Sequence, residues 1–163
     1  MGAMIRAEAA DLPDDGALKT PDRLSRRASR LLSQLTTRSD RLITEGLALA
    51  DARKWHYAVL ASLQEHGPAS QAELSRRSGI YRSDMVGVLN ELAERDLVER
   101  APDPDDRRRN IITISARGRI HLRRLDKVLD DLHDELLAPL SPAERDQFVQ
   151  VLTRLLDHHT GTA

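Results

Sequence analysis

Residues 70–114 read SQAELSRRSGIYRSDMVGVLNELAERDLVERAPDPDDRRRNIITI, and this stretch decides the fold. It opens with Ser70 three residues before Glu73, a pairing that satisfies free N–H groups at a helix start and predicts a short helix of about two turns. A second short helix is expected over residues 82–95, after a turn that contains Gly79. Its expected inward-facing residues are Met85, Val86, Leu89 and Leu92. Two short helices joined by a tight glycine-containing turn are the pattern of a helix-turn-helix.

A β-hairpin is expected directly after the second helix. Residues 97–100 and the β-branched residues 110–114 predict two short strands, and the proline- and aspartate-rich residues 102–106 predict the loop between them. Arg107, Arg108 and Arg109 then stand at the tip of this wing. Fold stability requires no such cluster, whereas a phosphate backbone or a narrow minor groove relieves its repulsion. The alternative is that the neighbouring aspartates simply neutralise the arginines.

The second helix of the pair carries the candidate base-reading residues. Arg82, Ser83 and Asp84 lie in its first turn, and Gly87 and Asn90 follow one and two turns later. Inserting this helix in a major groove presents such side chains to base edges. Asp84 gains from the helix dipole, but it repels phosphate unless it accepts a hydrogen bond from cytosine. Gly87 costs about 1 kcal/mol of helix propensity, which indicates either close backbone approach to DNA or tight packing beneath the helix.

Helices flank this central lobe on both sides. Apolar spacing predicts a long helix over residues 22–49 and a second over residues 53–65. Residues 116–137 place leucines at alternating spacings of three and four, a heptad seam able to pack along another helix. Ser141, Pro142 and Glu144 predict the start of a last helix. The expected fold is mainly α, a winged helix-turn-helix with N- and C-terminal helices that form a dimerisation region.

These elements divide the 163 residues into four expected segments. Residues 1–20 form a polar tail whose first three residues look like a cloning remnant. Residues 21–52 and 116–159 supply dimerisation helices around the DNA-binding lobe of residues 53–115. The chain has no cysteine and no apolar run of membrane-spanning length. A cytoplasmic protein without a membrane partner is therefore expected.

Charge is unevenly distributed although the net charge is only −1. Between Arg76 and Arg124 the sequence holds twelve arginines and eight acidic residues, whereas the rest of the chain is acidic overall. A basic centre suits a polyanion-binding surface, although a solvated charged face explains the charge equally well.

With these residues in view, the chain resembles the MarR family of bacterial transcription regulators. Residues 103–118, DPDDRRRNIITISARG, look like the family's wing, its second strand and the following helix start. Residues 92–100, LAERDLVER, resemble the segment between recognition helix and wing, and the resemblance covers about residues 22–158. The sequence departs from the family pattern at Tyr81, Asp84 and Ser115. The first two departures leave the operator sequence open.

The resemblance implies several roles. The first helix and the last two would form the dimer interface, Arg108 would enter the minor groove, and Asp106 would orient the arginine pair. A small molecule would bind between the dimerisation and DNA-binding lobes and change operator affinity. The absence of cysteine excludes the oxidation-sensing branch of the family.

The effector site is the least determined feature. Trp55, His56 and Tyr57 hold most of the aromatic character and would lie near the family's usual pocket, where they could line a site for a phenolic or other aromatic effector. Core and interface packing is the favoured interpretation of these residues. The six histidines show no metal-ligand spacing, and no cofactor is expected.

The leading hypothesis is a homodimeric, sequence-specific protein that binds double-stranded DNA. It would repress transcription from a pseudo-palindromic operator whose half-sites lie about one helical turn (~10 bp) apart. The alternatives are a non-specific or architectural DNA binder, and a winged-helix module whose wing arginines bind an acidic protein. No nucleophile elbow, phosphate loop or paired catalytic carboxylates support an enzyme.

Overall fold

The computed structural model describes residues 21–106 and 108–161. The polar tail of residues 1–20 and the wing residue Arg107 lie outside the described residues. The described residues divide into two units, with the boundary between Thr37 and Arg38. No helix of the described residues is long and apolar enough to cross a membrane.

The predicted single helix over residues 22–49 is wrong in its first turn. The structure has a four-residue helix, α1 (Asp22–Ser25), and then α2 (Ala28–Leu49). The chain leaves helical geometry at Arg26, where φ is −103° and ψ is 6°. One helical turn is too short to be stable by itself, and α1 has no buried residue to hold it. Pro21 therefore starts a turn that does not continue into the long helix.

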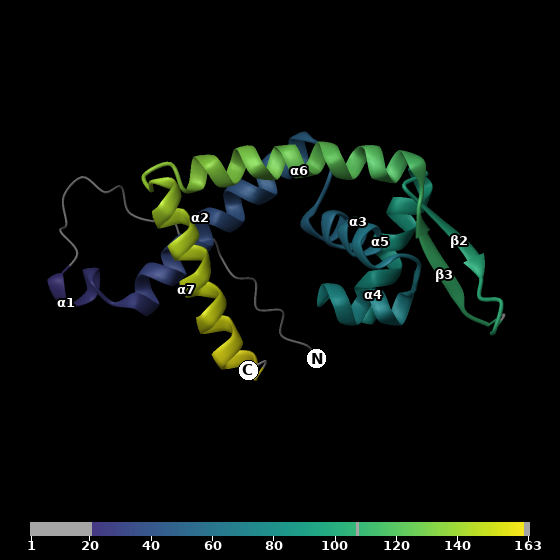
Figure 1. Ribbon diagram of the computed structural model, residues 1–163, viewed down its shortest axis with the longest axis horizontal. Coiled ribbons are helices and arrows are strands. Elements are labelled where there is room, and N and C mark those ends of the chain that lie inside the picture. The colour runs from purple at the N-terminus through teal and green to yellow at the C-terminus, as the bar shows by residue number, and fades with distance from the viewer. Residues whose placement is uncertain (1–20, 107, 162–163) are drawn as a thin grey trace, which may run out of the picture. The chain divides into compact units, whose positions relative to one another are not determined.

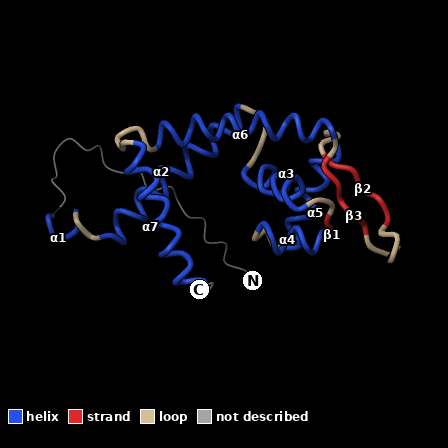
Figure 2. The backbone as a smooth tube through the Cα atoms, in the orientation of Figure 1, coloured by secondary structure: helices blue, strands red, loops and turns tan. Residues whose placement is uncertain are grey.

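The second unit contains a helical lobe with a small sheet (Figures 1 and 2). Its elements are α3 (Lys54–His66), β1 (Ala69–Ser70), α4 (Gln71–Ser78), α5 (Arg82–Glu94), β2 (Val98–Pro102) and β3 (Asn110–Ile114). The three strands form an antiparallel sheet in the order β1-β3-β2. This arrangement confirms the predicted mainly α fold with a β-hairpin wing.

Two details of the sheet differ from prediction. No sequence pattern predicts β1, because this strand has only two residues and forms through the pairing of Ala69 with Ile112. Pro102 was expected in the loop, but it ends β2 opposite Asn110. Proline lacks an N–H group, and an edge strand tolerates this loss.

Local signals position the two helices of the helix-turn-helix. The backbone N–H of Ser70 donates to Glu73 Oε2 at 2.8 Å, and the N–H of Glu73 donates to Ser70 Oγ at 3.3 Å. This capping box starts α4 as predicted. Gly79 ends it with a φ of 70°, a left-handed conformation that glycine adopts without strain. The turn then directs α5 across the lobe.

The inward face of α5 is partly different from the predicted one. Its buried residues are Met85, Val88, Leu89 and Leu92. Val86 was predicted to face inward, but its side chain is 46% exposed. A helix turns about 100° per residue, so burial of Met85 and Leu89 on one face directs Val86 toward the other.

Two hydrophobic clusters hold the second unit together. The larger lies inside the lobe and includes Leu60, Leu74, Leu89, Ile112 and Leu122. The smaller joins the end of α2 to the next long helix through Leu47, Ala50, Ala52, Leu125 and Leu129. Tyr57 packs against both clusters.

The long helix α6 (Ala116–Leu136) begins beside the wing (Figure 1), and its side chains contribute to both clusters. Its Leu122 belongs to the lobe cluster, and Leu125 belongs to the smaller one. Gly118, in the first turn of α6, lies against the backbone of Leu97. A Cβ added to Gly118 would stand 2.1 Å from the Leu97 carbonyl oxygen. The root of the wing and the start of α6 are therefore in direct backbone contact.

The last helix, α7 (Pro142–Thr160), contains no buried residue. Its predicted apolar face comprises Phe148, Val151, Leu152, Leu155 and Leu156. Phe148 and Leu152 are half-buried, whereas Val151, Leu155 and Leu156 are exposed. An apolar helix face that its own chain leaves uncovered is a surface available to another molecule.

Candidate nucleic-acid interface

The predicted reading residues of α5 lie together on its outer side. Arg82, Ser83, Asp84, Gly87 and Asn90 are all exposed. Asp84 lies in the first turn, where the partial positive charge of the helix N-terminus stabilises a carboxylate. Ser83 Oγ donates to Asp84 Oδ1 at 3.4 Å. The helix therefore presents a continuous, mainly polar surface that no other described part of the chain covers.

Gly87 has open space outside it. A Cβ built on this residue meets no atom within 4 Å. Tight packing within the chain, one of the two explanations that the sequence left open, therefore does not account for the glycine. Close approach of another molecule to the helix backbone is the explanation of Gly87 that remains.

Asn90 is fixed by a residue that the sequence did not identify. Arg100, on β2, donates through Nη2 to Asn90 Oδ1 at 2.8 Å. This bond fixes the oxygen end of the amide, so the Nδ2 protons are left to donate elsewhere. Both exposed side chains then offer hydrogen-bond donors at the last turns of α5.

The wing tip is ordered by its aspartates. Asp106 Oδ1 accepts from the backbone N–H of Arg108 at 3.1 Å and from Arg108 Nε at 3.3 Å. Asp103 Oδ1 accepts from the N–H of Asp105 at 2.9 Å. The side chain of Arg108 is nevertheless 92% exposed. Asp106 thus holds the Nε edge of the Arg108 guanidinium, while the rest of this group remains exposed to solvent.

A groove joins the wing to the helix-turn-helix. It has a volume of about 310 Å³. Its lining residues are Ser70, Gln71, Ala72, Arg82, Arg108, Arg109 and Asn110. The start of α4, the start of α5 and the wing therefore meet at one place. Three arginines and no carboxylate line the groove, so it is suited to an anion such as a backbone phosphate.

The three residues of the predicted effector site do not surround one cavity. Trp55 is 47% exposed and Tyr57 is half-buried, with its hydroxyl donating to Asp126 Oδ1 at 3.0 Å. His56 is buried, and it lines a pocket of about 390 Å³ together with Arg53, Glu91 and Arg95 among others.

His56 is held from both sides of its ring. Nδ1 accepts from the backbone N–H of Arg53 at 3.2 Å, so Nε2 carries the proton that it donates to Glu91 Oε2 at 2.8 Å. Arg53 pairs with the same carboxylate oxygen, so Glu91 bridges the two side chains. Burial, and then the charges of Arg53 and Arg95, lower the pKa of His56 from 6.5 to about 4. The ring is therefore neutral at pH 7.

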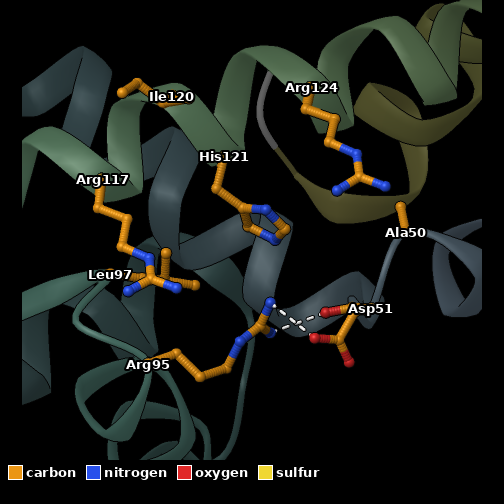
Figure 3. Close-up of a pocket in the computed structure, with 8 residues that line it drawn as sticks. All are labelled: Ala50, Asp51, Arg95, Leu97, Arg117, Ile120, His121 and Arg124. Carbon is orange, nitrogen blue, oxygen red and sulfur yellow. Dashed lines mark hydrogen bonds and ion pairs between the residues drawn. The ribbon is translucent and has the colours of Figure 1, made fainter.

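A different pocket is strongly cationic (Figure 3). It has a volume of about 340 Å³ and opens between the end of α2, the turn after α5 and the start of α6. Its lining residues are Ala50, Asp51, Arg95, Leu97, Arg117, Ile120, His121 and Arg124. Arg95 is paired with Asp51 at 3.1 Å. The pocket therefore has an excess of positive charge beside apolar side chains.

His121 and Arg124 have unused hydrogen-bonding capacity in this pocket. His121 Nε2 is buried without a hydrogen-bond partner among the described residues. Burial, and then Arg95 and Arg124, lower the pKa of His121. Arg124 forms no ion pair within the described part of the chain. The exposed guanidinium of Arg124 is thus available to a bound molecule, whereas His121 Nε2 is buried beneath the pocket lining.

Comparisons with known proteins agree with this geometry. A family model described as the MarR family matches residues 45–109. The transcriptional repressor NicR of Pseudomonas putida is 25% identical over 138 residues, which are 85% of this chain and 87% of NicR. A probable transcriptional regulator from Pseudomonas aeruginosa has a solved structure with a TM-score of 0.71 and 30% identity, covering 81% of this chain and 98% of that one. The chain belongs to the MarR family.

Solved MarR-family structures include bound states. MarR of Escherichia coli in complex with operator DNA is 25% identical, with a TM-score of 0.68 and coverage of 78% of this chain and 92% of that one. The PcaV regulator of Streptomyces coelicolor, solved in complex with its natural ligand, is 25% identical, with a TM-score of 0.68 and coverage of 86% and 98%. The present chain is thus a MarR-type transcription regulator, and the family's members are regulators rather than enzymes.

Three features of this MarR-family site escaped sequence reasoning. Val86 is exposed, Arg100 positions Asn90, and Arg95 lines the cationic pocket beside Asp51. The exposure of Val86 was predictable in principle, because residues 85, 88, 89 and 92 fit an inward helical stripe better than a stripe that includes 86. The two arginine contacts join residues 10 and 44 positions apart, and no local pattern identifies them. Across the described residues, no group of three or more His, Asp or Glu side chains could hold a metal ion.

Proposed function

We propose that this protein is a homodimeric repressor that binds a pseudo-palindromic operator. Each subunit places α5 in the major groove and its wing in the adjacent minor groove, with Arg108 inserted and oriented by Asp106. The observation that carries the proposal is the groove that joins Arg82 of α5 to Arg108 and Arg109 of the wing. One phosphate there fixes the helix and the wing together on the duplex. NicR, the relative of similar length, is named as a repressor.

The uncovered apolar face of α7 supports dimerisation. Val151 is 43% exposed, Leu155 45% and Leu156 64%. A second copy of the chain, related by a twofold axis, buries this self-complementary surface and brings two recognition helices to one face of the DNA. Replacement of Leu155 by glutamate places a charge in that interface. We expect Leu155→Glu to sediment as a monomer at concentrations where the wild type sediments as a dimer, and Arg154→Glu on the adjacent exposed position serves as its control.

An anionic effector fits the cationic pocket better than the pocket beside His56. The former carries three arginines against one aspartate, whereas the latter contains Asp51, Glu91 and Glu94 beside its two arginines. Arg124 supplies the planar donor pair that a carboxylate accepts bidentately. Leu97 and Ile120 offer apolar contact to a ring. A small aromatic carboxylate is therefore the proposed effector class, and its binding weakens the operator complex.

Selection of the purified protein on a random duplex library at near-physiological salt tests the DNA-binding proposal. Enrichment of an inverted repeat with half-sites about one turn (~10 bp) apart supports it. Arg108→Ala should then weaken binding to the enriched duplex, while Arg123→Ala, an exposed arginine of α6, should not. Retardation of DNA without enrichment favours the architectural binder. Undiminished DNA affinity in Arg108→Ala favours the protein-interaction module.

The effector proposal has its own test. Benzoate and nicotinate are titrated into the operator complex, with uncharged benzamide as the matched compound. We expect the carboxylates, and not benzamide, to release the DNA. Arg124→Ala should abolish release, whereas Arg123→Ala, one residue away and outside the pocket, should retain it. Equal release by benzamide, or by the Arg124→Ala variant, contradicts the anionic site.

A further inference from the structure

The outer surface of α5 is not uniformly polar. Arg82, Val86 and Asn90 follow one another at intervals of four residues, so they form one stripe along the helix. Val86, in the middle, is 46% exposed. A branched aliphatic side chain thus stands between two side chains that donate hydrogen bonds.

The described chain leaves this valine 46% exposed. It belongs to neither hydrophobic cluster, although Met85 and Leu89 beside it belong to the larger one. The neighbouring Gly87 has no atom within 4 Å of a built Cβ. An approaching molecule therefore reaches Val86 and the helix backbone at the same place.

The arginines around the stripe favour DNA as the approaching molecule. Arg82 lines the cationic groove with Arg108 and Arg109, and Arg100 holds Asn90 at the other end. Donors at both ends suit the acceptor-rich edges of purines in a major groove, and the apolar group in that groove is the 5-methyl of thymine.

We propose that Val86 makes the protein select a thymine in each half-site, by packing its methyl groups against the thymine 5-methyl. The inference rests on the proposed insertion of α5 in the major groove and specifies what that helix reads. Gly87 allows the contact, because a side chain there would hold the helix away from the bases. Loss of one buried methyl corresponds to about 0.8 kcal/mol, or roughly a four-fold change in affinity.

The test replaces thymine by uracil, which removes the methyl and leaves the base-pairing groups unchanged. Each duplex carries uracil at one thymine position, replaced at the symmetry-related place in both half-sites. For the wild type, we expect one symmetry-related position at which uracil raises Kd roughly four-fold per half-site. In Val86→Ala, which should fold normally because the side chain is exposed, thymine and uracil at that position should bind equally.

A matched variant separates this contact from general weakening of the complex. Asn90→Ala should bind more weakly, yet it should retain the preference for thymine over uracil at the Val86 position. The inference is overturned if Val86→Ala keeps the full uracil penalty, or if no thymine of a bound operator is sensitive in the wild type. Those results leave operator binding itself intact. Failure of the wild type to enrich any sequence overturns both the proposed function and this inference.

Discussion

Arg95, the residue that caps the end of α5, donates to Asp51 twice. Its Nη1 contacts the backbone carbonyl oxygen of Asp51 at 2.7 Å, and its Nη2 lies 3.1 Å from the carboxylate. Asp51 has a φ of 56° in the turn between α2 and α3. A single side chain therefore connects the end of α5 to the turn that follows α2.

The hydrogen bond from Arg95 Nη1 to the backbone carbonyl oxygen of Asp51 should contribute most of the stability of this connection. The Asp51 side chain is 90% exposed, so solvent screens its charge. We expect Arg95→Ala to lower the free energy of unfolding by about 1.5 kcal/mol and Asp51→Asn by no more than about 0.5 kcal/mol. Asparagine tolerates the left-handed conformation, which makes it the matched control. Urea denaturation measures both values, and equal losses would show that the carboxylate dominates.

Replacement of Gly87 should separate stability from binding. Alanine gains about 1 kcal/mol of helix propensity over glycine, and the added Cβ meets nothing within 4 Å. Gly87→Ala should therefore raise the free energy of unfolding while weakening operator binding. Thermal denaturation and a DNA titration on the same sample measure the two effects. A variant that is more stable and binds with unchanged affinity would contradict the close approach of DNA to this part of α5.

Gly118→Ala should have the opposite effect on stability. Its Cβ would stand 2.1 Å from the Leu97 carbonyl oxygen, which belongs to the backbone and cannot turn aside. We expect a loss of about 1–3 kcal/mol in the free energy of unfolding, as is usual for overpacking. Gly87→Ala is the control for the helix-propensity change. A stable Gly118→Ala protein would mean that the first turn of α6 moves freely against the wing root.

The stability of the protein should fall in mild acid. The pKa of His56 is lowered from 6.5 to about 4 in the folded chain, so between these values the unfolded chain binds more protons. The contribution of His56 is full above pH 6.5 and declines as the pH falls toward 4, by up to about 3 kcal/mol. The lowered pKa of His121 acts in the same direction.

His56→Gln isolates this effect, because glutamine also offers an acceptor and a donor but does not titrate. Urea denaturation at pH 7.5, 6 and 5 should show a steeper loss of stability for the wild type than for His56→Gln. Parallel curves for the two proteins would contradict the lowered pKa.

Asp106 should affect DNA binding through Arg108 alone. Asp106→Asn removes the charge that accepts from Arg108 Nε at 3.3 Å but keeps an oxygen for the backbone N–H. We expect weaker operator binding in Asp106→Asn and little further loss when Arg108→Ala is added. Additive losses in this double-mutant cycle would show that the two residues act independently.

Local signals explain how much of this fold could be predicted from the sequence. The capping box at Ser70 and the left-handed Gly79 define the helix-turn-helix, and the proline- and aspartate-rich loop defines the wing. Each is a short-range pattern with its own physical cause. The interruption at Arg26 was missed, because the apolar spacing continues across it although the backbone does not. β1 was missed because two residues carry no periodicity.

The exposed face of α5 could be predicted, because a single element supplies its residues. Arg82, Ser83 and Asn90 share one helix, so their common exposed face follows from helical spacing. The cationic pocket takes Asp51, Arg95 and Arg124 from separate elements. Their meeting depends on how the helices pack, and that packing is not encoded in any local stretch. The sequence instead indicated Trp55, His56 and Tyr57 of α3 as a possible effector site. In the structure Tyr57 packs against both hydrophobic clusters.

The contact between Gly118 and Leu97 holds the start of α6 against the root of the wing, so a rotation of this helix would turn about its first turn. A helix of 21 residues is about 31 Å long. A rotation of about 5° about its first turn therefore displaces its far end by roughly 2.7 Å, by simple trigonometry on that length. If the far ends are anchored in a dimer, the same rotation changes the separation of the two wings instead. The spacing of operator half-sites that such a protein tolerates would then depend on how firmly the start of α6 is held at the wing root, where the Ser115 N–H also donates to the Leu97 carbonyl oxygen at 3.1 Å.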